Sequence, residues 1–280
     1  MKTGIRIALT GTASASLLAL TGCAGLFGPD IENPPALSEI DEQMWESMEE
    51  AGSVTLVTSL DDLADMEPQS AEAMQQMFGE DVSDMKIYGA LDGSGTAMSV
   101  GDDDLMRVFG KDEAYLSADA VFGIFENQNM GFGADADEIL SEVSEDLSGS
   151  WIDFGSELES STGDDAFDVG ALFDQLQESW KDGDSSETPI DRDEISDEGI
   201  HEVRDEQDVW VYEGEDEGQE LVLEADPDAP KILEISDGDM TMSFTKWGET
   251  EEPEHPEDSD VLTQQDLEQR VSEAMVGGSF

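Results

Sequence analysis

Two blocks of short strand-like segments, separated by a helical stretch, are the feature that most restricts the fold of this chain. In the first block, a β-branched run at 53–58 precedes hairpin-forming segments between residues 82 and 116, with Gly- and Asp-rich turns between them. In the second block, Met242 and Phe244 alternate with polar residues, which is typical of a sheet with one apolar and one wet face. Its expected strands are 200–204, 208–213, 219–224, 231–236 and 240–245. The order of strands, helices and strands predicts one α+β domain.

Amphipathic helices are predicted around these strands. Leu37, Ile40, Met44 and Met48 recur at intervals of three and four residues, which predicts a helix over 36–51 that Gly52 ends. Ser38 is its candidate N-cap. Further helices are expected within 61–80 and at 135–147, 169–180 and 261–275, with an acidic loop at 182–198. We expect a curved antiparallel β-sheet, an open half-barrel, with the helices packed on its concave side.

The N-terminus has the pattern of a lipoprotein signal peptide. Lys2 and Arg6 precede a short apolar stretch at 7–20, which is too short and too rich in Ser, Thr and Gly for a membrane span of about 20 apolar residues. The run Leu20-Thr21-Gly22-Cys23 fits a lipobox, so residues 1–22 are predicted to be cleaved and Cys23 to carry a diacylglyceryl group. The alternative is an ordinary secretory signal with a chance cysteine.

The predicted anchor defines the compartment and the organisation of the chain. Cys23 is the only cysteine, so a lipidated chain has no thiol for a disulfide, and its core must hold the fold. Residues 23–35 are predicted to link the lipid to a folded domain at 36–248. An acidic, Pro-rich tail with a short terminal helix follows at 249–280. We expect a protein held by lipid on the extracytoplasmic side of the cell membrane.

The charge balance restricts the partners. The chain has 71 acidic and 11 basic residues, which gives a net charge of −60. Nucleic acid is not expected as a partner, since phosphate contacts need clustered Lys and Arg. Adhesion to anionic lipid headgroups is disfavoured as well. Because salt screens such self-repulsion, a salty habitat is one interpretation, and an ordinary acidic extracellular protein is the other.

The sequence has none of the common catalytic motifs. It has no G-x-S-x-G elbow, P-loop, G-x-G-x-x-G or H-E-x-x-H. His201 and His255 are not expected to be catalytic, because no serine is placed to pair with them. The acidic runs at 102–104, 164–165 and 191–197 are interpreted as solvated surface instead of a calcium site. We therefore expect that the chain is not an enzyme and that it binds no metal or cofactor. The alternative is a hydrolase that uses two carboxylates.

Apolar side chains on the predicted sheet and helices are the candidates for a ligand cavity. A sheet that bends around helices without being filled leaves room for an oily molecule, and flexible Met side chains adapt to such ligands. The alternative is that the same residues form an ordinary core. The candidates are Trp45, Met48, Leu56, Ile87, Leu91, Met98, Phe122, Phe125, Leu172, Phe173, Leu176, Trp210, Leu221, Leu223, Met242 and Phe244.

The order of these segments resembles a known family. The lipobox, the helix with Met44-Trp45 and the strand Val54-Thr55-Leu56 are similar in order to those of the LppX/LprAFG lipoproteins, which share the open-barrel fold of the LolA/LolB carriers. The later runs with this resemblance are Val209-Trp210-Val211-Tyr212, Leu221–Leu223, Lys231-Ile232-Leu233-Glu234 and Phe244-Thr245-Lys246-Trp247. The resemblance implies a half-barrel with an apolar cavity that binds or transfers lipids or lipidated glycans, without enzymatic activity.

Two functions are consistent with these sequence features. The first is a membrane-anchored lipoprotein that binds or carries a hydrophobic small molecule, a lipid or a lipidated glycan. The second is an interaction or sensor module with a filled core, no ligand and another envelope protein as its partner. The packing of the interior distinguishes them.

Overall fold

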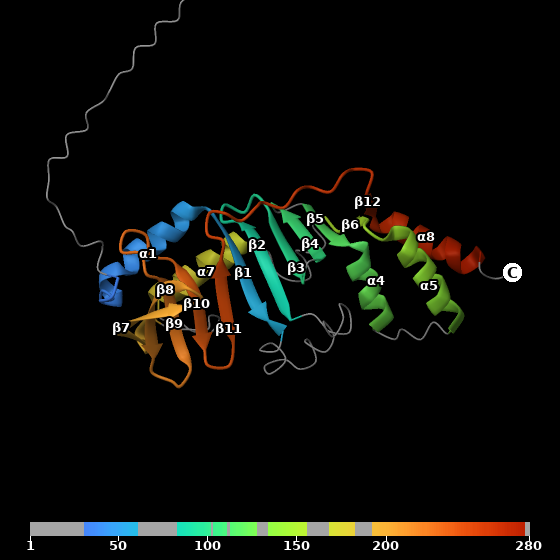
Figure 1. Cartoon of the computed structure of the whole chain (residues 1–280). Coiled ribbons are helices and arrows are strands. Elements are labelled where there is room, and N and C mark those ends of the chain that lie inside the picture. The colour runs from blue at the N-terminus through green and yellow to red at the C-terminus, as the bar shows by residue number, and fades with distance from the viewer. Residues whose placement is uncertain are drawn as a thin grey trace, which may run out of the picture.

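A computed structural model describes residues 31–60, 83–101, 103–110, 113–127, 134–155, 168–182 and 192–277. The predicted signal peptide, Cys23 and the helix expected within 61–80 lie outside the described residues. The fold is α+β, as expected, and is built on one large sheet (Figure 1).

The described strands form a single 12-stranded sheet in the order β12-β6-β5-β4-β3-β2-β1-β11-β10-β9-β8-β7, and the sheet is not closed into a barrel. Every neighbouring pair is antiparallel except β12 and β6, which run parallel. The strands are β1 (Ser53–Ser59), β2 (Asp84–Ala90), β3 (Thr96–Val100), β4 (Asp103–Phe109), β5 (Glu113–Ser117), β6 (Trp151–Asp153), β7 (Ile195–Arg204), β8 (Gln207–Gly214), β9 (Gln219–Glu224), β10 (Ile232–Asp237), β11 (Thr241–Thr245) and β12 (Val261–Thr263).

The two predicted strand blocks meet at β1. This strand pairs with β2 of the first block on one side and with β11 of the second block on the other. Leu56 therefore lies opposite both Ile87 and Phe244, residues that are far apart in the sequence. Both blocks become parts of one sheet because each of them pairs with β1.

The register places apolar residues in one continuous row across eight strands. Each residue of the row lies directly opposite the next, so all of their side chains point to the same face of the sheet. From β11 to β12 the row is Phe244, Leu56, Ile87, Met98, Met106, Leu116, Ile152 and Leu262. The adjacent row on the opposite face is almost entirely polar or aromatic and consists of Thr245, Thr55, Tyr88, Ala97, Arg107, Tyr115, Asp153 and Thr263.

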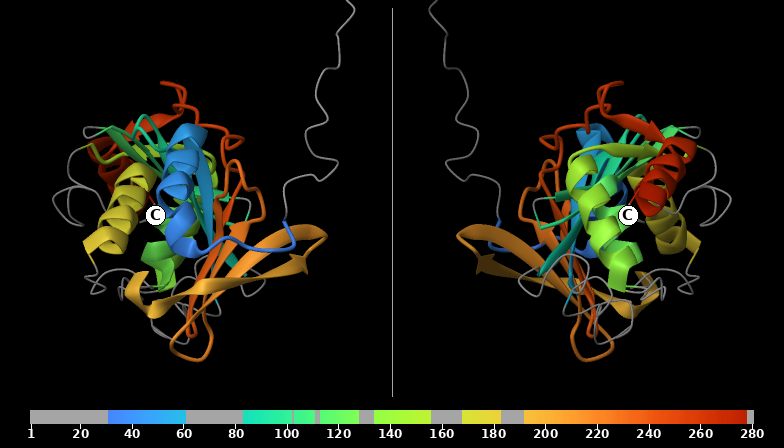
Figure 2. Two further views of the ribbon diagram at one scale, coloured as in Figure 1. Left: turned by 90° about the vertical axis from the view of Figure 1, so that its left-hand side faces the viewer. Right: turned by 90° about the vertical axis from the view of Figure 1, so that its right-hand side faces the viewer.

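The described α-helices pack against the apolar face, in two groups. Helices α1 (Leu37–Ala51) and α7 (Val169–Asp182) cover β1, β2 and the strands of the second block. Helices α4 (Ala118–Asn127), α5 (Ala134–Leu147) and α8 (Gln264–Gly277) cover the β5, β6 and β12 end. Figure 2 shows both groups on the same side of the sheet. The helices remove this large apolar face of the sheet from contact with water.

The C-terminal segment completes both the sheet and the core. After β11 the chain crosses the sheet, where Arg107 donates to the Glu254 carbonyl (2.9 Å) and His255 stacks on Phe109 with ring centroids 3.6 Å apart. It then pairs with β6 as β12, and Leu267 of α8 is buried with α4 and α5. Because residues 261–263 form this strand, α8 starts at Gln264, three residues after the predicted start.

Two further boundaries differ from the predictions. Ala36, not Ser38, occupies the N-cap of α1, and it makes no side-chain cap; the end at Gly52 (φ 74°) is confirmed. The predicted acidic loop ends early, because a 3₁₀ turn at Arg192–Glu194 leads directly into β7 at Ile195. Ile195 is buried, which explains why the strand begins there.

The polar face carries an ion-pair network around Arg204. Its guanidinium binds both carboxylate oxygens of Glu220 (2.8 and 3.1 Å) and one of Glu202 (3.0 Å), and it lies 3.7 Å from Glu234. The hydrogen bonds from Arg204 lower the pKa of Glu220. The pKa of Glu234 is raised, first by burial and then by the charge of Glu220. Ionisation of the Glu234 carboxyl is therefore less favourable in the folded protein than in the unfolded chain.

Replacing Glu234 should stabilise the protein at neutral pH. A group with a raised folded pKa stabilises the fold below its unfolded pKa, and this contribution is lost as the pH rises through the folded pKa. Glu234→Gln should therefore raise the free energy of unfolding by up to about 1 kcal/mol at neutral pH and leave it almost unchanged in acid. Urea unfolding at neutral pH and at acidic pH measures this free energy. Glu220→Gln is the control and should destabilise at neutral pH; a loss of stability in Glu234→Gln at neutral pH would contradict the assignment.

Candidate ligand-binding site

Most of the predicted cavity residues meet in one cluster between α1, α7 and the sheet. Those buried in this cluster are Trp45, Met48, Leu56, Phe173, Leu176, Trp210, Leu221, Leu223 and Phe244. Ile87, Leu91 and Met242 are partly buried and pack against it. Their convergence follows from the register, which places residues of β1, β2 and β8–β11 on the face that α1 and α7 cover.

The remaining candidates lie elsewhere. Met98 packs against a small cluster around Val100 and Leu105, and Phe122, a residue of α4, is buried in the cluster that α4 forms with α5 and α8. Leu172 is half-buried on α7. Phe125 lies within α4, and its side chain is outside the described part. The candidate set therefore extends over both helix groups.

Aromatic rings fill the space between α1, α7 and the sheet. The ring centroid of Trp45 lies 5.5 Å from that of Phe173 and 6.1 Å from that of Trp180, both edge to face. Trp247 lies 6.1 Å from Phe173 and stacks on Phe244 at 6.0 Å. Sequence reasoning missed Trp180 and Trp247. For Trp180 the signal was present, because Val169, Phe173, Leu176 and Trp180 follow helical spacing.

The indole N–H of Trp45 is the one buried side-chain polar atom without a hydrogen-bond partner in the described part of the chain. Trp45 is 4% exposed, so this donor has lost water without gaining a protein acceptor. An unmade hydrogen bond of this kind costs about 1–3 kcal/mol. Trp180, in contrast, donates from its indole to Asp41 (2.8 Å).

A groove of about 620 Å³ lies above Trp45, between α1 and α7. Hydrogen bonds join the two helices on either side of Trp45 along α1, from Trp180 to Asp41 and from Gln177 to Glu49, both at 2.8 Å. The lining has carboxylates and a few cationic groups around two indole rings, and consists of Asp41, Glu42, Trp45, Glu46, Glu49, Gln177, Trp180, Lys181, Arg192 and Asp193. The groove is therefore polar at its walls, and the apolar cluster lies beneath it.

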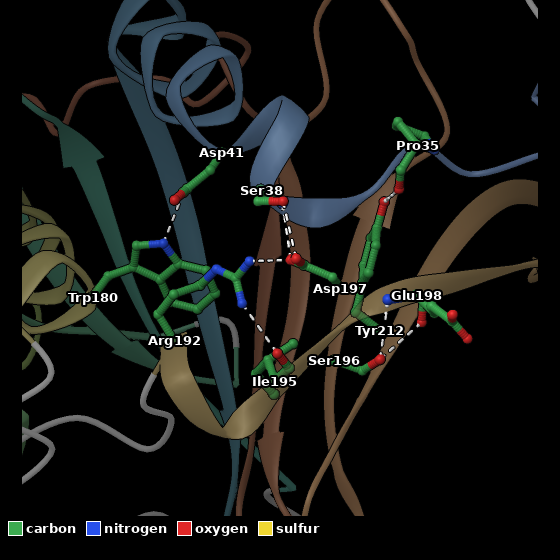
Figure 3. A network of polar contacts seen from close by, with 10 residues as sticks. All are labelled: Pro35, Ser38, Asp41, Trp180, Arg192, Ile195, Ser196, Asp197, Glu198 and Tyr212. Carbon is green, nitrogen blue, oxygen red and sulfur yellow. Dashed lines mark hydrogen bonds and ion pairs between the residues drawn. The ribbon is translucent and has the colours of Figure 1, made fainter.

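A polar network fixes the start of α1 to β7 beside this groove (Figure 3). Asp197 accepts hydrogen bonds from the backbone N–H (3.1 Å) and hydroxyl (3.0 Å) of Ser38 and pairs with Arg192. Arg192 also donates to the Ile195 carbonyl (3.0 Å). These contacts, first of all the one from Arg192, lower the pKa of Asp197. Arg192 thus joins the 3₁₀ turn, β7 and α1 through one side chain.

The predicted linker contacts the folded domain at β8. The Trp210 indole donates to the Ile31 carbonyl (2.9 Å), and the Tyr212 hydroxyl donates to the Pro35 carbonyl (3.0 Å). Both aromatic residues belong to the apolar cluster. The chain that precedes α1 is therefore held at the β7–β8 end of the sheet.

The apolar row is incompletely covered at the border between two clusters. Ile87 packs against the α1–α7 cluster and Met98 against the cluster of Val100, and these two neighbours in the row are only half-buried. Such side chains offer dispersion contacts to an apolar molecule without charge or hydrogen bonding. Chemically, this part of the face suits hydrocarbon.

The histidines lie away from Ile87 and Met98, His201 on the edge strand β7 and His255 on the polar face. His201 contacts Asp208 on the neighbouring strand (2.8 Å), and His255 stacks on Phe109 and lies 3.5 Å from Glu113. Among the residues that the structure describes, no group of three or more His, Cys, Asp or Glu is placed to hold a metal ion.

The chain matches no known protein family, and no curated protein matches its sequence. The resemblance to the LppX/LprAFG lipoproteins therefore remains a prediction. Within the described ranges, none of the helices is both long enough and apolar enough to span a bilayer.

Removing Asp197 should loosen the start of α1. Asp197→Ala deletes the acceptor of both Ser38 donors and the partner of Arg192, so we expect a loss of about 1 kcal/mol of stability, since half-exposed ion pairs contribute little more. Because the folded pKa of Asp197 is lowered, this contribution is present above its unfolded pKa and is lost as the pH falls through the folded value. Chemical unfolding and amide exchange near Ser38 measure the effect. Glu198→Ala, one residue away, is the control and should change neither quantity.

Proposed function

We propose that this chain is a membrane-anchored lipoprotein that binds or carries a hydrophobic ligand, a lipid or a lipidated glycan, between the sheet and its helices. The observation that supports this most is the one-sided apolar row across eight strands, with Ile87 and Met98 half-buried where two clusters meet.

We further propose that the sheet is an open half-barrel of the LolA/LolB type, with the helices on its concave side. Two features support this proposal: the sheet is not closed into a barrel, and the described helices share one face (Figure 2). In a half-barrel, the two helix groups can separate without breaking strand hydrogen bonds. That separation would make room for acyl chains along the row.

The energetics favour acyl chains as the apolar part of the ligand. Each buried methylene contributes about 0.8 kcal/mol, so a chain along the row gains affinity in proportion to its length. Met85, Met98 and Met242 lie partly buried on this face, and their flexible thioethers can adapt to chains of different shape.

The tether would keep the body close to its membrane. The link from Cys23 to Ile31 spans at most roughly 30 Å when fully extended. The β7–β8 end, where Trp210 binds the Ile31 carbonyl, would therefore stay within that distance of the lipid anchor.

A module with a filled core is the second candidate. The contacts of Trp45 with Phe173 and Trp180 favour it, because rings in edge contact leave little space beneath α1. Such a module would bind another envelope protein through its surface and take up no lipid. The two candidates differ in what co-purifies with the protein from its native membrane.

A polar substitution in the apolar row should weaken ligand binding. Ile87→Gln places an unsatisfied amide against the acyl chain, so we expect roughly tenfold weaker binding of a fluorescent fatty-acid probe. Val57→Gln is the matched control, because Val57 lies on the neighbouring strand opposite Lys86 and points to the other face. Thermal unfolding verifies that both variants fold. Equal probe affinity in both variants, together with no organic-extractable lipid in the native protein, would favour the filled module.

The anchor is tested separately at Cys23. Cys23→Ala removes the thiol that would receive the diacylglyceryl group, so the protein should move from the membrane fraction to the soluble fraction. Metabolic labelling with a fatty acid should be lost at the same time. Unchanged membrane association of this variant would contradict lipidation at this residue.

A further inference from the structure

The polar face of the sheet has a groove of its own, of about 510 Å³, on the opposite side from the helices. It lies over β1, β2 and β3 and is bounded by the segment that follows β11. Its lining combines hydroxyl groups, two lysines and three carboxylates, and consists of Thr55, Lys86, Tyr88, Ser99, Gly101, Asp104, Lys246, Glu249, Thr250 and Glu251.

Two lysines in this groove lack a carboxylate partner. Within the described part of the chain, Lys86 donates only to the Gly101 carbonyl (3.2 Å), and Lys246 forms no ion pair. Elsewhere on the same face, Arg204 pairs with Glu220 and Lys231 pairs with Glu224 (3.3 Å). Lys181 and Arg270 also form no ion pair within the described residues, but Lys86 and Lys246 line one groove together.

The one carboxylate of the groove that comes from the sheet is already occupied. Asp104 accepts a hydrogen bond from the Tyr88 hydroxyl (2.6 Å) and two from Arg107 (2.6 and 3.0 Å). Its charge is therefore matched by Arg107 and does not neutralise Lys86. Glu249 and Glu251 are exposed at the rim.

Ser99 adds a hydroxyl donor to the same groove. It lies directly opposite Lys86 in the register, is 5% exposed and lines the groove. Its hydroxyl makes no hydrogen bond within the described residues, although its neighbours on the sheet do. Most of Ser99 is buried, but its hydroxyl oxygen is open to the groove, so an oxygen of a bound molecule is a suitable partner.

We propose that this groove binds an oxyanion carried by a polyhydroxylated molecule, such as a phosphate or sulfate ester of a polyol. Lys86 and Lys246 would hold the anion, and the Ser99 hydroxyl would donate to one of its oxygens. The rim carboxylates Glu249 and Glu251 would accept hydrogen bonds from the hydroxyl groups of the same ligand. This combination of cations and acceptors discriminates a polyol ester from a bare anion.

The site is independent of the proposed lipid carriage. Ile87 and Lys86 are adjacent on β2 and point to opposite faces of the sheet, so the two ligands would not compete. The net charge of −60 repels free anions at long range, and salt screens this repulsion more than the short contacts within the groove. Binding is therefore best measured at high ionic strength.

Calorimetric titration of the full mature chain tests the proposal. The probes are inorganic phosphate, a soluble hexose phosphate and vesicles that contain phosphatidylglycerol, whose headgroup is also a polyol phosphate. We expect the hexose phosphate to bind more tightly than inorganic phosphate. The double variant Lys86→Gln/Lys246→Gln should lose at least about tenfold in affinity, and Ser99→Ala should lose severalfold.

Lys231→Gln is the matched control, because it removes one ammonium from the same face outside the groove, and it should bind like the wild type. Lysine-dependent binding of the hexose phosphate supports a soluble ligand, and lysine-dependent binding of vesicles alone supports a lipid headgroup. If all probes bind the wild type and the double variant equally, or none binds the wild type, the site is refuted. Thermal unfolding of each variant separates loss of binding from loss of fold.

Discussion

The pairing of β1 with both β2 and β11 is the interaction on which the rest of the structure depends. It joins two strand blocks that are separated by a helical stretch, and it aligns Phe244, Leu56 and Ile87 in one row. Once these residues share a face, the side-chain period of two fixes the opposite face as polar. The helices then have one apolar surface to cover, and both helix groups pack on it. The core must hold the fold, because the single cysteine permits no internal disulfide.

The scarce cations connect elements that the excess of carboxylates would otherwise push apart. Arg192 joins β7 to α1 through Asp197, Arg107 contacts both Asp104 and the segment after β11, and Arg204 neutralises Glu220 and Glu202. Arg107 also lies over the Trp151 ring, 4.4 Å from its centroid. Each of these arginines bridges segments that are distant in the sequence or groups of like charge. Lys86 and Lys246 differ from these arginines, because they line one groove and form no ion pair within the described residues.

Local sequence predicted the longer strands and α1, α5 and α7, because alternation and helical spacing are visible over several residues. It missed α4, because Gly123 interrupts the apolar run. A capping signal was present, since the Ser117 hydroxyl accepts a hydrogen bond from the Ala120 N–H (3.1 Å). The three-residue strands β6 and β12 are too short for a periodic signal, and their pairing stabilises them. The polar groove was also beyond reach, because only the register brings Lys86 opposite Ser99. The cavity candidates were chosen as apolar residues, which predicts their burial but not whether space remains between them.

The two faces of this sheet therefore differ in what they can bind. On the helix side, Trp45 has a buried indole N–H without an acceptor in the described part of the chain, and Ile87 and Met98 are half-buried. Both features leave possible contacts unmade on this face. On the polar side, binding depends on charges that a closed helical layer would have buried at great cost. Because one sheet carries both faces, the strands that order the apolar row also set the spacing of the lysine groove. A change in register would remove both at once, since a shift by one residue exchanges the faces.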